Sequence, residues 1–270
     1  MPGAQVELVA DAGTLSRPML QRSTYAHWPG LACETSGVAT FVLIPGAGTD
    51  PRVYDATIEA LDALGHGGLA PALPLDDPDA APSDHADAVV RVLPADAELI
   101  VVAQSLGAFA APLVAARAPV AQLVLVAPMI PRPGETAGEW WASTGHAEAI
   151  ADLFERHGPM SSWGPDVIAE VFLHDVDPGI ARDNERYQGT PGDGLFGEPW
   201  PLESWPEVPT RVLAPVGDRL FPLEFQRRIA RERLGLEIDE IPGGHLPMLS
   251  RPHELAERLI ELAQRGQGAG

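Results

Sequence analysis

The chain has 270 residues, 45% of them hydrophobic and 21% charged, which suffices to bury a sizeable core in one large domain. Its formal net charge of −20 repels polyphosphates and so excludes nucleic acid and anionic membranes as expected partners. It contains no lysine and a single cysteine, Cys33, which excludes lysine Schiff-base chemistry, an intramolecular disulfide and a cysteine-rich zinc site.

Targeting signals are not evident in the sequence. The N-terminal segment lacks a basic stretch followed by a long apolar run, and no stretch reaches the roughly 20 apolar residues that a membrane helix needs. We therefore expect a soluble, cytoplasmic protein that acts on a small molecule, and we leave its oligomeric state open.

Short apolar runs alternate with helical patterns, which is typical of a parallel sheet covered by helices on both faces. The first four expected strands are rich in Val, Ile and Leu, as strands buried on both faces should be. The last alternates apolar and polar residues and suits an edge of the sheet. The expected strands are residues 40–44, 98–103, 122–127, 211–214 and 236–241.

Helix signals lie between these strands. Asp50 before Pro51 predicts a helix after the first strand, and a second helix is expected after Ser83. A third begins directly after Ser105 and contains Pro112, where we expect a kink or a lost backbone bond. The last helix is expected to begin near residue 250 and to bury an apolar face made by Leu255, Leu259 and Leu262.

From residue 129 to residue 205 the strand pattern stops, and helical pieces separated by Gly and Pro take its place, with helices expected at residues 147–157 and 165–172. This stretch holds five of the six tryptophans. We interpret it as a helical lid inserted into one domain, whose core comprises residues 1–128 and 206–270. Trp140 and Trp141 are the lid residues expected to line a substrate pocket, with packing inside the insert as the alternative.

A serine lies where the strand at residues 98–103 meets the following helix. In the sequence ELIVVAQSLGAFA, the small residues Ala103 and Gly107 stand two positions either side of Ser105. A tight strand-to-helix turn requires small residues there, and its strain holds the hydroxyl at the end of the sheet, an arrangement called a nucleophile elbow. The consensus is G-x-S-x-G, with alanine replacing the first glycine here. A serine that only caps a helix is the common alternative.

Two later segments place an acid and a histidine after strands of their own. APVGDRLFP carries Asp218, and IPGGHLPML carries His245. Each alone is usually a turn former or a surface residue. With Ser105 they give the chain order serine, aspartate, histidine that a nucleophile elbow of this kind requires. We expect His245 to act as the base and Asp218 to orient it, with Glu135 as the second candidate for the acid.

A tetrahedral oxyanion needs two preorganised hydrogen-bond donors. The backbone N–H of Leu106, at the start of a helix, is one expected donor, and that of Ala47 in the loop LIPGAGTD is the other. Gly46 and Gln104 adjoin these groups and are expected to bind substrate. The loop could instead cradle a phosphate, but the missing lysine and the glycine spacing disfavour that interpretation.

The segments FVLIPGAG, VVAQSLGAF, VGDRLFP and GGHLPMLSRP resemble the α/β-hydrolase superfamily. They are most similar to its small esterases related to plant methylesterases and hydroxynitrile lyases. The resemblance spans nearly all of residues 38–265 and matches the serine–aspartate–histidine triad residue for residue. It implies an α/β-hydrolase fold with an eight-stranded, mostly parallel sheet, helices on both faces, a helical lid and no cofactor.

Two departures from this branch affect the expected chemistry. Its esterases usually carry a histidine just before the oxyanion glycine, where this chain has Pro45. Its lyases carry a lysine after the catalytic histidine, where this chain has Leu246, so cyanohydrin cleavage is disfavoured. His66, His85 and His174 have no partners at metal-ligand spacing, so we expect them to be structural or solvent-exposed and expect no metal site.

The leading functional hypothesis is a serine hydrolase that cleaves an ester bond of a small, partly apolar substrate through an acyl-enzyme. Two alternatives keep the fold, because fold does not determine chemistry. One is a cofactor-free lyase, cyclase or acyltransferase of a biosynthetic pathway. The other is a ligand receptor built on a hydrolase scaffold.

Overall fold

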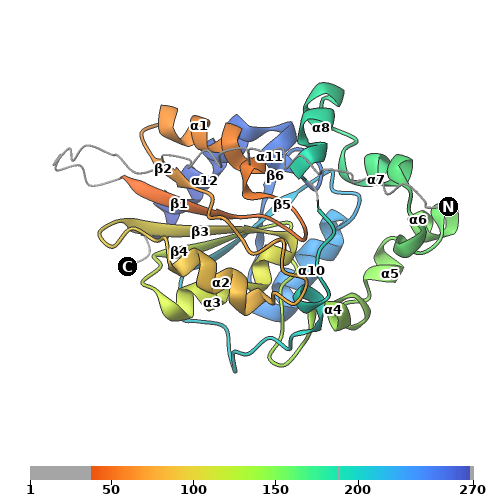
Figure 1. The fold of residues 1–270 in the computed structure, drawn as a ribbon, viewed down its shortest axis with the longest axis horizontal. Helices are drawn as coiled ribbons and strands as arrows, with labels where there is room; N and C mark the ends of the chain where they lie inside the picture. The colour runs from red at the N-terminus through yellow and green to blue at the C-terminus, as the bar shows by residue number, and fades with distance from the viewer. Residues whose placement is uncertain (1–37, 188, 268–270) are drawn as a thin grey trace, which may run out of the picture. The chain divides into compact units, whose positions relative to one another are not determined.

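The computed structural model describes residues 38–187 and 189–267, so Cys33 lies outside the described residues. Their sheet has six strands, all parallel, in the order β2-β1-β3-β4-β5-β6 (Figure 1). The strand that ends directly before the expected nucleophile, β3, lies inside the sheet between β1 and β4. The strands are β1 (Ala39–Ile44), β2 (Gly67–Leu69), β3 (Glu98–Gln104), β4 (Gln122–Val126), β5 (Thr210–Pro215) and β6 (Ile238–Ile241).

All five strands expected from the sequence are confirmed within two residues at each end, and β6 lies at the sheet edge as its alternation indicated. The sequence pattern missed β2, because its residues GGL lack the apolar run that marks a buried strand. Its Gly68 has a packing reason: a Cβ there would lie 2.9 Å from the Ile58 side chain. The described residues thus hold six strands where the resemblance implies eight.

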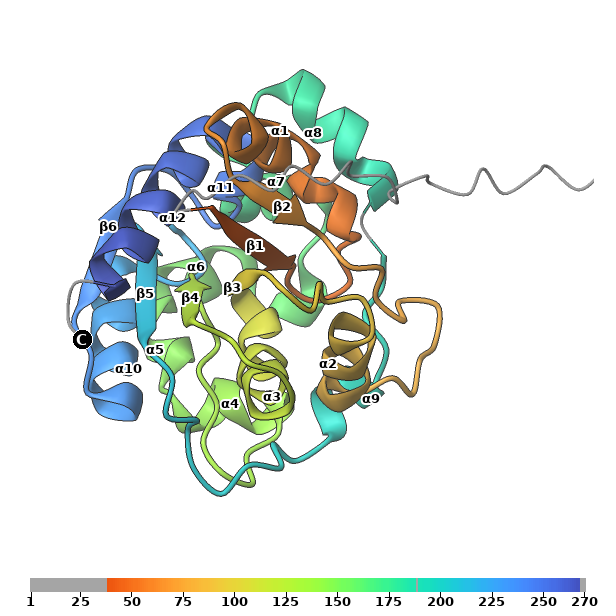
Figure 2. The ribbon, with the colours of Figure 1, turned by 90° about the vertical axis from the view of Figure 1, so that its left-hand side faces the viewer.

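Helices cover both faces of the sheet, and the strand residues alternate between them. Phe41 and Leu43 of β1 pack with α1 (Asp55–Ala63) and α12 (Pro252–Gln267). Val42 and Ile44 pack on the opposite face. Figure 2 shows helices on both sides of the sheet. That face is covered by α2 (Pro82–Val90), α3 (Ala111–Arg117) and α10 (Leu223–Leu234). The expected apolar face of the last helix is confirmed, since Leu255, Leu259 and Leu262 are fully buried.

Two helix starts differ from the expectation. The segment after Asp50 is first a 3-10 turn (Pro51–Tyr54) and becomes α1 only at Asp55. Similarly, a 3-10 helix (Ser105–Phe109) begins at the serine itself, and α3 begins only at Ala111. Pro112 therefore stands in the first turn of α3, where its missing N–H removes no hydrogen bond within the helix and requires no kink.

Between β4 and β5 the described residues form helices and loops and no strand. The helices predicted at residues 147–157 and 165–172 are present, the first divided in two. Most of these helices gather on the right-hand side of Figure 1. They are α4 (Ala137–Ser143), α5 (His146–Ala149), α6 (Ala151–His157), α7 (Pro165–Phe172), α8 (Pro178–Asn184) and α9 (Gly194–Gly197). The assignment of residues 129–205 as a lid insert remains our proposal.

Backbone hydrogen bonds join the two ends of this helical stretch between β4 and β5. Gly134 N donates to Trp200 O, and Trp200 N donates to Glu135 O, both at 3.0 Å. The buried Trp200 also donates its indole N–H to Phe109 O at 3.1 Å. We call Gly134, Glu135 and Trp200 the neck. Its hydrogen bonds attach the helical stretch between β4 and β5 to the 3-10 helix that begins at Ser105.

Candidate active site

The end of β3 turns sharply at Ser105. Its φ of +52° is one of two positive values among the described non-glycine residues, and such a backbone costs on the order of 1–3 kcal/mol. The turn leaves no room at Gly107, where a Cβ would lie 2.7 Å from Pro45 O and 3.0 Å from Ile44 O. These are the strain and the crowding that a nucleophile elbow requires.

Asp218 and His245 lie together beyond the ends of β5 and β6. The His245 Nδ1 and the Asp218 Oδ2 are 2.8 Å apart, and both residues are buried. The other carboxylate oxygen, Oδ1, accepts the backbone N–H groups of Leu220 and Phe221, each at 2.9 Å. With both its oxygens engaged, the carboxylate holds the imidazole by Nδ1 and leaves Nε2 as the nitrogen for proton transfer.

The turn of His245 is also tied to the end of β3. Gln104, next to Ser105, is buried and donates from Nε2 to His245 O at 3.1 Å. The hydrogen bonds of the described residues do not include one between the Ser105 hydroxyl and the imidazole. In enzymes without bound substrate, catalytic hydrogen bonds are often long and shorten in the complex.

The loop after β1 approaches the serine closely. A Cβ at Gly46 would lie 3.1 Å from Ser105 Cβ and 2.6 Å from Gln104 Oε1. Ala47 and Leu106, the expected oxyanion donors, line one narrow hollow beside the serine turn. The Leu106 N–H stands in the first turn of the 3-10 helix, where backbone donors lack helical partners.

His85 of α2 lines the same hollow, a placement the sequence analysis missed. His85 is only 8% exposed. This burial lowers the pKa of its imidazole, although the negative charge of Asp84 acts in the opposite direction. A neutral histidine therefore lies near the expected oxyanion loop. The only sequence signal was its place beside Ala86 on the buried side of the helix.

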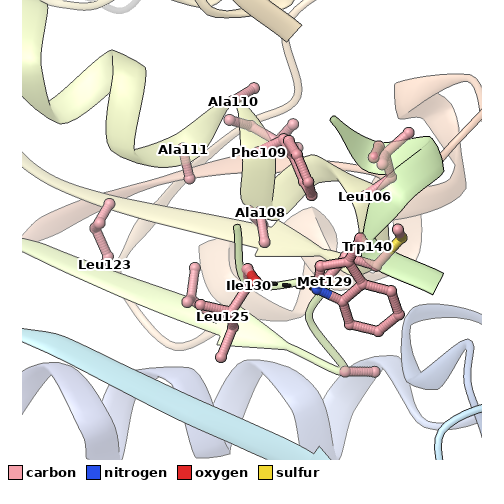
Figure 3. Packing of buried hydrophobic residues seen from close by; sticks show 14 of the residues in the cluster. Leu106, Ala108, Phe109, Ala110, Ala111, Leu123, Leu125, Met129, Ile130 and Trp140 are labelled. Atoms are coloured by element: carbon pink, nitrogen blue, oxygen red, sulfur yellow. Dashed lines mark hydrogen bonds between the residues drawn. The ribbon is translucent and has the colours of Figure 1, made fainter. Parts of the chain in front are cut away.

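The two candidate tryptophans differ in burial. Trp140 is fully buried, and its indole N–H donates to Ile130 O at 3.0 Å (Figure 3). Trp141 is partly exposed and its ring lies 4.8 Å from that of His146. Both tryptophans contact Phe221, whose ring is 5.1 Å from His245. The aromatic cluster thus connects the insert to the histidine.

Glu135, the second candidate for the acid, is engaged elsewhere. It forms an ion pair with Arg233, whose side chain is 1% exposed and also donates to Ile130 O at 2.5 Å. Burial raises the pKa of the Glu135 carboxyl, but the hydrogen bonds and charge of Arg233, with hydrogen bonds from Ser143 and the Arg132 N–H, outweigh it and hold that pKa below its usual value. This pair ties the segment after β4 to α10.

Within residues 38–187 and 189–267, no group of three or more histidines, cysteines or carboxylates is arranged to hold a metal ion. None of the helices described there is long and apolar enough to cross a bilayer.

Comparisons with known proteins agree with this architecture. The model of a family described as the alpha/beta hydrolase family matches residues 41–258. A pyrethroid hydrolase from Sphingobium faniae is 25% identical with a TM-score of 0.68, and the alignment covers 84% of this chain and 98% of the hydrolase. Polyneuridine aldehyde esterase is 20% identical with a TM-score of 0.67, covering 83% and 99%. An extracellular alpha/beta-hydrolase from a Paenibacillus species is 18% identical with a TM-score of 0.66, covering 83% and 98%. The search of curated proteins gave no match.

Proposed function

The chain belongs to the alpha/beta hydrolase family and is a carboxylesterase-like hydrolase, and we propose that it cleaves esters through an acyl-enzyme formed on Ser105. The observation that carries the proposal is the 2.8 Å contact between His245 Nδ1 and Asp218 Oδ2. In this contact Asp218 holds the imidazole by Nδ1, which leaves Nε2 available to take the proton of Ser105. All three residues follow the carboxyl ends of strands.

The first step is attack on the ester carbonyl. A serine hydroxyl is a weak nucleophile until a base removes its proton, and His245 Nε2 takes that proton as the Oγ–carbon bond forms. The imidazolium that results is stabilised by Asp218. His245 then gives the proton to the leaving alcohol, which departs as the acyl-enzyme forms.

The negative charge that develops on the carbonyl oxygen requires donors that are in place before the reaction. The backbone N–H groups of Ala47 and Leu106 supply them in this proposal. In the second half of the cycle, water attacks the acyl group while His245 accepts a proton from that water. His245 then gives this proton to the Ser105 oxygen as the bond between that oxygen and the acyl carbon breaks. The carboxylic acid is released and the enzyme is regenerated.

Substrate recognition is proposed around these groups. Gly46 keeps the loop open beside the nucleophile, because any side chain there would meet Ser105 and Gln104. Trp141, the partly exposed member of the tryptophan pair, offers the insert's apolar contact to the substrate. The proposed substrate remains a small, partly apolar ester, and the cytoplasmic location remains a prediction.

A fluorophosphonate probe tests the nucleophile directly, because it reacts covalently with an activated serine. We expect the wild type to be labelled and Ser105→Ala to be silent. Labelling that persists in Ser105→Ala would refute the assignment.

A panel of short p-nitrophenyl esters tests the reaction class. Turnover well above the Ser105→Ala background supports the esterase. Labelling without turnover would favour a non-hydrolytic reaction or a ligand receptor on the same scaffold.

A further inference from the structure

The segment between α7 and α8 packs against the turn that carries His245. The ring of Phe172 lies 5.4 Å from the imidazole, edge-on at 85°. Three residues further on, Asp175 Oδ2 accepts the backbone N–H of Gly244 at 2.7 Å. The insert therefore contacts both the expected base and the backbone immediately before it.

Two glycines make this approach possible. A Cβ at Gly244 would lie 2.7 Å from Asp175 Oδ1 and 2.7 Å from His174 Cε1. Gly243 has a φ of +109°, which side-chain-bearing residues rarely adopt. Its carbonyl accepts the N–H of Gly217, next to Asp218, at 2.8 Å. The turn before His245 is thus held from one side by the Asp218 loop and from the other by Asp175.

Stability alone gives a poor account of Asp175. Its Oδ1 is buried with no hydrogen-bond partner among the described residues, and burying an unpaired carboxylate oxygen costs free energy. The oxygen that is paired, Oδ2, makes a charge-assisted bond to the residue before the base.

We propose that Asp175 is a positioning residue, which fixes the backbone of His245 through Gly244. The activity of the base then depends on how the insert packs against this turn. The inference rests on the proposed function, because that function makes His245 the base. It adds a residue from outside the triad to the machinery that aligns the imidazole.

Three variants separate positioning from general support of the fold. Asp175→Ala removes the acceptor, whereas Asp175→Asn keeps a carbonyl oxygen that can accept the Gly244 N–H. Asp177→Ala is the matched control: Asp177 is exposed and accepts backbone N–H groups of Gly179 and Ile180 at the start of α8. If Asp175→Ala does not fold, Asp175→Ser takes its place, because its shorter side chain does not reach Gly244.

Kinetics with a p-nitrophenyl ester give the first readout. We expect Asp175→Ala to lower kcat by about 10- to 100-fold with KM within about threefold, because a slightly displaced base slows proton transfer more than binding. Asp175→Asn and Asp177→Ala should stay within about threefold of wild type in kcat. Equal losses in Asp175→Ala and Asp177→Ala, or no loss in a folded Asp175→Ala, would overturn the proposal.

The second readout needs no turnover. The His245 Nδ1–H that bonds Asp218 should give a far-downfield proton NMR signal, identified by its absence in His245→Ala. We expect this signal to shift or broaden in Asp175→Ala and to persist in Asp175→Asn. A wild type that is neither labelled nor active would refute the proposed function, while the NMR comparison would still decide whether Asp175 positions the imidazole.

Discussion

Replacing Asp218 by asparagine should disable the base while leaving the fold intact. The carboxylate Oδ1 accepts two backbone N–H groups at 2.9 Å, so the asparagine carbonyl is expected to take that place. The amide NH₂ then faces His245 Nδ1, where Oδ2 now lies at 2.8 Å. The imidazole must present Nδ1 as an acceptor and carry its proton on Nε2, the tautomer that cannot deprotonate Ser105.

The expected size of the effect follows from the charge that is lost. An imidazolium and a carboxylate about 4 Å apart attract by about 4 kcal/mol at an effective dielectric constant of about 20. At 1.36 kcal/mol for each factor of ten, this removes roughly three decades of rate, and the wrong tautomer adds up to about one more. We therefore expect kcat to fall by about 10³- to 10⁴-fold in Asp218→Asn.

The assay is hydrolysis of a p-nitrophenyl ester, with thermal unfolding measured on the same preparations. Asp177→Asn is a matched control, because Asp177 Oδ1 also accepts two backbone N–H groups, and its hydrogen-bond partners among the described residues include no histidine. It should stay within about twofold of wild type. An Asp218→Asn variant that loses less than about tenfold would contradict the role given to this carboxylate.

Three further changes test the fold and its charges. Gly107→Ala places a Cβ 2.7 and 3.0 Å from two backbone carbonyl oxygens, and urea unfolding should show a loss of about 1–3 kcal/mol, whereas an unchanged midpoint would argue against the tight elbow. Glu135→Gln leaves Arg233 buried without its carboxylate and should cost about 3 kcal/mol at pH 7. Because the folded pKa of Glu135 is lowered, this contribution is present above the ordinary glutamate pKa of about 4.3 and is lost as the pH falls through the folded value, so the difference from wild type should shrink at pH 3. Burial lowers the pKa of both His85 and His146, so their neutral forms favour folding above about pH 6.5 and stability falls as the pH drops below it; a double His→Gln variant should lose less between pH 7 and 5.

Much of the core could be predicted from the sequence because burial on both faces leaves an uninterrupted apolar run. The segment ELIVVAQ of β3 shows this, and so does the helical spacing of Leu255 and Leu259 in α12. The strand β2 could not be found this way, since its two glycines lack side chains and are defined by contacts with β1 and Ile58. Pro112 misled for a local reason: the 3-10 turn after Ser105 shifts the start of α3 by several residues.

The expected triad could be named from chain order, but the groups around it could not. Gln104 and His245 are 141 residues apart, and Asp175 and Gly244 are 69 apart, so no local periodicity relates them. Which insert residue reaches which turn depends on how the insert packs. For the same reason, the sequence left Trp140 open between a pocket wall and packing, and the structure gives it a fully buried indole bonded to Ile130.

The neck formed by Gly134, Glu135 and Trp200 marks two positions at which the helical stretch could be exchanged for that of another protein. Residues 136–199 lie between Glu135 and Trp200, which are joined by a backbone hydrogen bond, so the two ends of this stretch lie side by side. A chimaera that exchanges this stretch for its counterpart from another hydrolase could keep the neck, the sheet and Ser105, Asp218 and His245 from the parent. Asp175 would travel with the graft, so a donor segment should bring its own acceptor for the N–H of Gly244.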